Sequence, residues 1–306
     1  MNINFNILWF EDNDEWYTAF SDSVEDYIKD LCFQPKIKRF KNIPIEELES
    51  VLETTNFDLI LADLNLEDGE KGHTAIQKIR DKNILADALF YSTDGVDKIR
   101  TEMKPSFLDG AYLSNRDDIF LDEKVRALID KTVRRAEDVV NVRGMMLDNT
   151  SEFDEKLKEI IRKFLSGNSP ENKMILDKYA HSITSSHISK TATKIEKLEV
   201  EAFIHNSLID GFILDSNKLA MIVNKIFKSF YPNENTMKGF HNKFNLEIIS
   251  ERNKLAHAKK EPESTGVFYF IDKTGARTDY DSDKCREIRQ SITAFHTLLD
   301  NALDTI

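Results

Sequence analysis

Residues 5–12 read FNILWFED, and residues 59–63 read LILAD. Each stretch is a short apolar run that ends directly in acidic residues. An uninterrupted apolar run of this length is typical of a strand that is buried on both faces of a parallel sheet. Residues 88–92, ALFYS, form a third run of the same kind. We therefore predict that the first half of the chain is built around a parallel sheet whose strands end in polar side chains.

Helical patterns separate these strands. From Trp16 to Leu31, apolar residues recur at three- and four-residue steps, as in an amphipathic helix. Five strands alternating with five helices predict an α/β domain with a doubly wound, flavodoxin-like parallel sheet. The other expected strands are 36–40 and 110–113, and the other expected helices are 44–54, 73–81, 96–103 and a last one from residue 122.

The second half has the pattern of an all-α bundle. The apolar pattern of the helix after residue 122 continues to Gly144, and Ser151 with Asp154 has the spacing of a capping box that starts a helix to about Leu165. A hairpin is expected from 267–271 and 278–280. We predict an α/β domain over 1–135, a helical connector over 136–150 and a helical domain over 151–306. Further helices are expected at about 170–184, 194–213, 216–230, 237–258 and 282–303.

Charge also separates the two halves. Residues 1–150 contain 19 Lys and Arg against 31 Asp and Glu, whereas residues 151–306 contain 23 of each. The acidic first half argues against nucleic-acid contact there. No apolar run approaches the roughly 18 residues of a membrane helix, and Cys32 and Cys285 have no metal-ligand spacing. With no secretion signal at the N-terminus, we expect a cytoplasmic protein without a membrane partner.

Acidic residues at the strand ends form a candidate site. Glu11 and Asp12 directly follow the first strand, and Asp63 follows a second. Ligands of an open parallel sheet bind at the carboxyl ends of its strands. Carboxylates gathered there would repel one another unless a hard cation such as Mg²⁺ lies between them. With the ion bound, Asp63 is placed to attack a phosphoryl donor, and the hydroxyl of Ser92 or Thr93 would bond the phosphoryl oxygens.

The three segments, in this order and at these intervals, resemble the receiver domain of response regulators over about residues 1–135. The resemblance implies that Glu11 and Asp12 hold Mg²⁺ together with Asp63 and the backbone carbonyl of Asn65. It also implies that Asp63 accepts a phosphoryl group from a histidine kinase or another phosphoryl donor.

Two further roles follow from the resemblance, and two positions depart from it. Ser92 would be the switch hydroxyl, and Tyr112 would be the aromatic residue whose rotamer reports activation. Asn115 stands where receivers usually carry a lysine that pairs with the phosphoryl group, which leaves Arg116 as the substitute. Glu67 stands where a proline is usual.

A second candidate site lies in the helical half. Asn253 and His257 are four residues apart and share a helix face. Arg252 would point about 140° away from His257 on an ideal helix. A histidine moves protons near neutral pH, and an arginine stabilises phosphate charge. Because RNA supplies its own nucleophile in the 2′-hydroxyl, these residues suit metal-free RNA cleavage.

The segment resembles the Arg-x4-6-His motif of the HEPN superfamily. That resemblance implies a homodimeric helical bundle over about 150–306 that pairs two motifs in one cleft and acts as a ribonuclease. The alternative is a solvated, basic helix end whose charges interact with the helix dipole. The sequence thus leaves two functions open. One is a response regulator that controls RNA cleavage through Arg252, Asn253 and His257, and the other is a non-catalytic signalling adaptor whose helical half binds a protein or nucleic acid.

Overall fold

The computed structural model describes residues 3–42, 45–66, 71–82, 84–104, 110–167, 174, 214–260 and 268–305. The chain forms two compact units, Met1–Asp138 and Val139–Ile306. The helix expected at 194–213, nearly all of the one expected at 170–184, and Glu67 lie outside the described residues.

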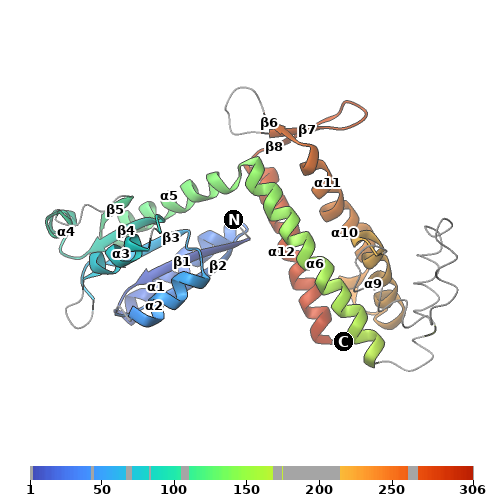
Figure 1. The fold of residues 1–306 in the computed structure, drawn as a ribbon, viewed down its shortest axis with the longest axis horizontal. Helices are drawn as coiled ribbons and strands as arrows, with labels where there is room; N and C mark the ends of the chain where they lie inside the picture. Colours follow the sequence, from blue (N-terminus) through green and yellow to red (C-terminus); the bar gives the residue numbers. More distant parts are fainter. Residues whose placement is uncertain are drawn as a thin grey trace. The chain divides into compact units, whose positions relative to one another are not determined.

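A five-stranded parallel sheet forms the centre of the N-terminal unit, in the order β2-β1-β3-β4-β5 (Figure 1). The doubly wound α/β fold predicted from the apolar runs is confirmed. The strands are β1 (Asn4–Phe10), β2 (Gln34–Phe40), β3 (Leu59–Asp63), β4 (Asp87–Ser92) and β5 (Ala111–Asn115). The helices are α1 (Asp14–Asp30), α2 (Ile45–Thr54), α3 (Gly72–Asp81), α4 (Val96–Met103) and α5 (Asp118–Ala136).

The helices cover both faces of this sheet, which is why its central strands are apolar on both sides. One core packs side chains of α1 and α5 against the sheet, including Val24 and Ile129. The other packs α2, α3 and α4 against the opposite face, including Ile76 and Ile99. All five residues of β3 are buried.

The strand order reverses between β1 and β3. From β1 the chain first moves outward to β2 and then returns to the other side of β1 to form β3. Such a switch point leaves a crevice beyond the carboxyl ends of the two strands, because their connections leave in opposite directions. Phe10 pairs with Ala62 in the register of β1 and β3, so Glu11 and Asp63 follow at the same edge.

The C-terminal unit is helical, with a small antiparallel sheet. Helices α6 and α12 lie side by side (Figure 1), and Phe153, Phe244 and Phe295 meet edge to face in the core. Its helices are α6 (Val139–Gly167), α9 (Ser216–Phe230), a 3-10 turn (Asn235–Met237), α10 (Phe240–Phe244), a π-helical turn (Asn245–Ile249), α11 (Ser250–His257) and α12 (Ser282–Thr305). The last three elements before α12, namely α10, the π-helical turn and α11, run as one continuous helix from Phe240 to His257.

The predicted helix start at Ser151 is wrong. Residue 151 lies in the middle of α6, which begins at Val139, and the Ser151 hydroxyl donates to the carbonyl of Leu147 at 3.1 Å. Asp154 cannot complete a capping box, since its carboxylate accepts a hydrogen bond from the Ser216 hydroxyl at 2.9 Å. The helix break lies instead between Ala136 and Val139.

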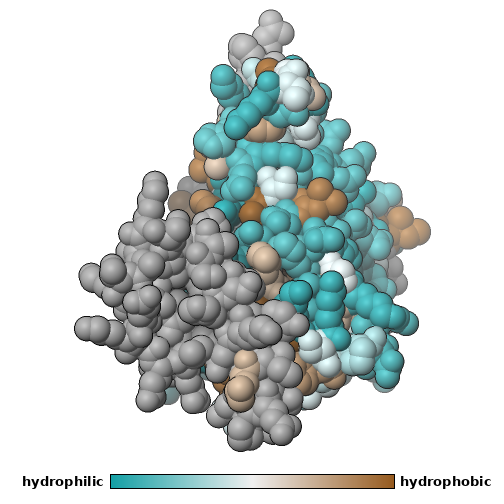
Figure 2. Space-filling model, turned by 90° about the vertical axis from the view of Figure 1, so that its right-hand side faces the viewer, coloured by the Kyte–Doolittle hydropathy of each residue, from teal (hydrophilic) through white to brown (hydrophobic). Residues whose placement is uncertain are grey.

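The predicted hairpin is present, with a third short strand. β7 (Phe268–Ile271) pairs with β8 (Arg277–Tyr280), and β6 (Lys259–Lys260) adds to the outer edge of β7. Among the described helices, none is long and apolar enough to cross a membrane. The described surface in Figure 2 is mostly hydrophilic, with apolar side chains scattered over it.

Candidate functional site

Three carboxylates gather at the carboxyl edge of the sheet, as predicted. Glu11 and Asp12 follow β1, and Asp63 ends β3. One oxygen from each of the three side chains lies within 4.8 Å of the other two. Such a set of hard oxygen donors fits a Mg²⁺ ion. Asp12 is partly exposed, whereas Glu11 and Asp63 are buried.

The Glu11 carboxylate is fully buried and hydrogen-bonded at both oxygens. Oε1 accepts from the backbone N–H of Asn13 at 2.8 Å and from Arg116 at 3.0 Å. Oε2 accepts from the Tyr91 hydroxyl at 2.8 Å. Burial raises the pKa of Glu11 to about 7, although these donors and the Arg116 charge oppose the rise.

The Asp63 carboxylate, 4% exposed, has a similar environment. Oδ1 accepts from the backbone N–H of Asn65 at 3.1 Å, and Oδ2 accepts from Arg116 at 2.7 Å. Burial raises the pKa of Asp63 to about 6, against the effect of the Asn65 hydrogen bond and the Arg116 charge. Of the two Asp63 oxygens, one therefore binds the arginine and the other binds a backbone N–H.

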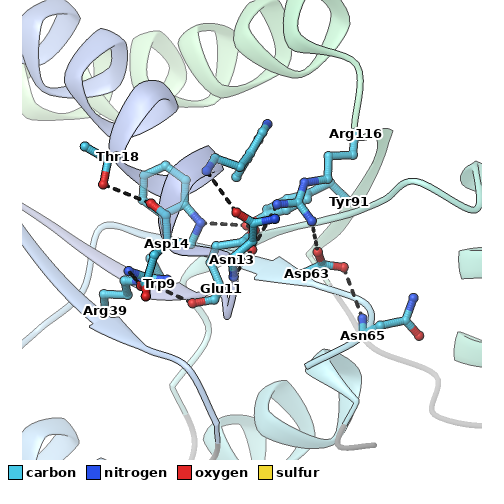
Figure 3. Close-up of polar contacts among 11 residues, drawn as sticks. Trp9, Glu11, Asn13, Asp14, Thr18, Arg39, Asp63, Asn65, Tyr91 and Arg116 are labelled. Atoms are coloured by element: carbon cyan, nitrogen blue, oxygen red, sulfur yellow. Dashed lines mark hydrogen bonds and ion pairs between the residues drawn. The ribbon is translucent and has the colours of Figure 1, made fainter. Parts of the chain in front are cut away.

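Arg116 joins the two buried carboxylates. Its guanidinium reaches Asp63 with one terminal nitrogen and Glu11 with the other, and its side chain is only 11% exposed (Figure 3). The ring of Trp16, on α1, lies 4.2 Å from the guanidinium carbon. The register of β4 and β5 pairs Ser92 with Asn115, and the backbone N–H of Arg116 donates to the Ser92 carbonyl at 2.9 Å. Arg116 therefore starts beside the end of β4 and reaches inward.

Asn115, at the position of the usual receiver lysine, does something else. Its side-chain oxygen accepts from the backbone N–H of Val96 at 3.0 Å, at the start of α4. The neighbouring Gly95 has a φ of 90°, a conformation that favours glycine. Asn115 thus anchors the loop before α4, and the adjacent arginine supplies the positive charge at the acidic site.

The other predicted switch residues have local partners. Ser92 is buried, and its hydroxyl oxygen accepts from the backbone N–H of Asp94 at 3.2 Å. Tyr112 is 37% exposed, and its hydroxyl accepts from Lys131 of α5 at 2.7 Å. Neither residue hydrogen-bonds to the acidic group among the residues described, so their roles stay predictions.

Sequence reasoning missed two residues of this site. Tyr91 pairs with Asp63 in the strand register and reaches Glu11 through its hydroxyl. Lys71 donates to the side-chain oxygen of Asn65 at 2.5 Å and pairs with Glu102 at 3.3 Å. The period-two alternation of β4 was the available signal for Tyr91, because it places residues 89 and 91 on one face.

Gly72 shapes the backbone behind the acidic site. A Cβ atom added there would lie 2.1 Å from the backbone oxygen of Asp63. The N–H of Gly72 donates to the carbonyl of Leu64 at 3.0 Å. The start of α3 therefore packs against the end of β3 at a distance that only glycine allows.

The Arg252–His257 segment forms a regular helix end. Arg252 donates two hydrogen bonds to the side-chain oxygen of Asn253, at 3.3 and 3.1 Å. His257 is exposed at the last position of α11. Within the described part of the chain, no hydrogen bond joins His257 to Arg252 or Asn253. The structure thus brings Arg252 and Asn253 together and places His257 on the same helix, at least four positions away in sequence from both.

No family model matches the chain, and no curated protein matches its sequence. Similar solved structures include the receiver domain of PhyR from Erythrobacter litoralis, with 18% identity, 42% of this chain and 90% of that chain covered, and a TM-score of 0.31. PhyR from Brucella abortus has 19% identity, 43% and 48% coverage and a TM-score of 0.30, so the chain spans about half of that protein. Full-length FixJ from B. japonicum has 13% identity, 69% and 98% coverage and a TM-score of 0.32. At these identities and scores, any function has to rest on the residues of the site.

Proposed function

We propose that the N-terminal unit is a receiver domain in which Asp63 accepts a phosphoryl group and thereby controls the helical unit. The observation that supports this most is the convergence of Glu11, Asp12 and Asp63 within 4.8 Å at the switch point of a parallel sheet. A buried carboxylate at the end of β3 is well placed as a nucleophile, and two more carboxylates beside it form a site for a divalent cation.

In this reaction an Asp63 oxygen forms a bond to phosphorus, and the bond between phosphorus and the donor's leaving group breaks. The leaving group departs with the electron pair. Arg116, already within hydrogen-bond distance of Asp63, stabilises charge on the transferred oxygens. Glu11, Asp12 and Asp63, with the backbone carbonyl of Asn65, would hold Mg²⁺, which when bound supplies neutralising charge. The Ser92 hydroxyl would bond a phosphoryl oxygen, and a histidine kinase or a small phosphoryl donor would supply the group.

The test is to incubate the full chain with Mg²⁺ and acetyl phosphate and to locate any acid-stable or acid-labile adduct by intact-mass analysis. We expect one phosphoryl group on the wild-type chain and none on Asp63→Asn. Asp97→Asn is the matched control, because Asp97 is an exposed aspartate of the same unit whose side chain is 98% exposed. Equal labelling of the wild type and Asp63→Asn, or no labelling of either, would contradict the assignment.

For the helical unit, RNA cleavage through Arg252 and His257 stays a prediction, and non-catalytic binding of a protein or nucleic acid is the alternative. The exposed ring of His257 supports access to a large substrate, whereas the Arg252 guanidinium is hydrogen-bonded to Asn253. A homodimer that brings two such helix ends together would complete a cleft. Incubation of the chain with mixed RNA distinguishes RNA cleavage from non-catalytic binding. His257→Ala is the test variant, and Lys259→Ala, at an exposed position, is the control. Cleavage that persists in His257→Ala excludes this histidine.

A further inference from the structure

The buried carboxylates of the acidic site already have donors on all four of their oxygens. Glu11 accepts from Asn13 and Arg116 at Oε1 and from Tyr91 at Oε2. Asp63 accepts from Asn65 at Oδ1 and from Arg116 at Oδ2. Arg116 is shared by the two carboxylates and binds one oxygen of each. The guanidinium therefore occupies the space that a shared cation would need.

A guanidinium and a divalent cation cannot both bind these oxygens closely. Mg²⁺ binds oxygen at about 2.0–2.1 Å and demands a near-octahedral shell. Arg116 lies 2.7 Å from Asp63 and 3.0 Å from Glu11. An ion on the same oxygens would bring two cations within a few ångströms of each other in a poorly solvated pocket, where Coulomb repulsion is strong. One of the two cations therefore has to release these two oxygens.

Arg116 has a second contact, with an aromatic ring of α1. Its guanidinium stacks on Trp16 of α1 at 4.2 Å. Trp16 also lines a groove of about 470 Å³ between α1 and α5, together with Phe20, Ile119 and Asp122. Release of Arg116 from the carboxylates changes the support of the Trp16 ring and hence one wall of this groove.

We propose that Arg116 is a built-in counterion that competes with Mg²⁺ for Glu11 and Asp63, and that its displacement is transmitted through Trp16 to the groove between α1 and α5. This rests on the proposed function only in that the acidic site accepts a divalent cation. The route differs from one through Tyr112, whose hydroxyl is held at the surface by Lys131. Arg116 offsets part of the negative charge of the site until the cation arrives.

The experiment is a titration of the full chain with Mg²⁺ alone. Binding is measured by calorimetry and by the change in tryptophan fluorescence. Arg116→Gln removes the competing charge, so we expect its Mg²⁺ dissociation constant to fall by about tenfold or more. Arg116→Lys keeps the charge and should bind Mg²⁺ nearly as weakly as the wild type. If Arg116→Gln does not fold, Arg116→Met provides a second uncharged variant with a long side chain, measured at the same pH. If the variant without a charge at position 116 binds Mg²⁺ as weakly as the wild type or more weakly, the proposal is overturned.

Trp16→Phe tests the transmitted signal. We expect this variant to retain Mg²⁺ binding by calorimetry and to lose the fluorescence change that the wild type shows. An unchanged fluorescence response in Trp16→Phe assigns the signal to Trp9 and overturns the route through Trp16. Failure here is distinct from failure of the phosphoacceptor role. If the chain takes up no phosphoryl group but Arg116→Gln binds Mg²⁺ more tightly, only the phosphoacceptor role of Asp63 is contradicted. If the chain is phosphorylated but Arg116→Gln binds Mg²⁺ no more tightly, only the competition by Arg116 is contradicted.

Discussion

Tyr91 donates its hydroxyl hydrogen to Glu11 at 2.8 Å, and the same hydroxyl oxygen accepts the indole N–H of Trp9 at 2.7 Å. All three side chains are fully buried. Burial raises the pKa of Tyr91 well above its usual value, so the phenol stays a donor. The hydrogen bonds from Trp9 to Tyr91 and from Tyr91 to Glu11 thus fix one oxygen of this carboxylate from inside the core, while Asn13 and Arg116 bind the other oxygen.

Replacement of Tyr91 by Phe should therefore destabilise the N-terminal unit. The variant leaves the Trp9 N–H and a Glu11 oxygen buried without this partner, at a cost of about 1–3 kcal/mol in the free energy of unfolding. Tyr112→Phe is the matched control, because its hydroxyl bonds to Lys131 at an exposed site, and it should change stability by less than about 0.5 kcal/mol. Urea denaturation measures both. Equal stability of the two variants would show that the buried hydroxyl contributes little.

Gly72→Ala should destabilise the N-terminal unit, because the added methyl group clashes with the backbone at the end of β3. The added Cβ would lie 2.1 Å from the Asp63 backbone oxygen, so α3 must shift away from β3. We expect a loss of about 1–3 kcal/mol. Gly144→Ala provides the opposite case, since Gly144 is exposed in α6 with nothing near its Cβ position, and alanine should stabilise a helix interior by about 0.5–1 kcal/mol. Urea denaturation measures both variants. If both substitutions shift the unfolding midpoint in the same direction, the close contact at Gly72 is not rigid.

Arg143 should stabilise the end of α11 from a distant part of the chain. Its guanidinium donates to the carbonyl of Leu255 at 2.6 Å and to that of Ala258. These carbonyls lie in the last turn of the helix or just past it, where regular partners run out. Arg143→Met should lower stability by about 1–3 kcal/mol. The exposed Arg100 serves as the control, because its ion pair among the described residues is with the exposed Asp97 of the same helix. Arg100→Met should change stability by less than about 0.5 kcal/mol.

The helical unit should lose stability in mild acid through His296. The ring accepts from Lys156 at Nδ1, 3.0 Å away, and its Nε2–H donates to Asn149 at 2.7 Å. Burial and the Lys156 charge lower the pKa of His296 to about 4, with Asp300 opposing. Glu152 lies 3.7 Å from Nε2. An unfolded histidine titrates near 6.5, so the unfolded state gains a proton first as the pH falls, and stability declines between about pH 6.5 and pH 4.

The measurement compares the wild type with His296→Gln by urea denaturation, followed by circular dichroism. From about pH 7 to pH 5, the free energy of unfolding should fall by about 2 kcal/mol more in the wild type than in the variant. All other titrating groups are common to the two chains and cancel in the comparison. Parallel pH profiles would mean that the folded ring accepts a proton without strain.

The sheet and its acidic edge were predictable because they depend on local patterns. Continuous apolar runs identified β1, β3 and β4, and the acidic residues directly after two of them share an edge in any parallel sheet. The bounds predicted for α9, residues 216–230, are those observed. Asp215 caps this helix by accepting from the backbone N–H of Lys218.

The missed features all depend on partners far away in sequence. Tyr91 reaches Glu11 across 80 residues. The Ser151–Asp154 spacing has the form of a capping box, but Asp154 bonds to Ser216 in another helix. Strand β6, only two residues long, has no periodicity to detect. A single sequence carries such pairings only implicitly, since no local signal marks them.

The wide π-helical turn at Asn245–Ile249 means that the helix from Phe240 to His257 contains one residue more than a regular α-helix of equal rise. The rotation of α11 relative to α10 therefore depends on the number of residues in this turn rather than on their side chains. Deletion of the exposed Leu246 would be absorbed by closing the turn, and thermal unfolding should shift little. Deletion of Lys254 would instead rotate His257 by about 100° against the buried side of the helix. Length variation in this turn is thus absorbed where it arises, whereas length variation after the turn changes the direction of the terminal histidine.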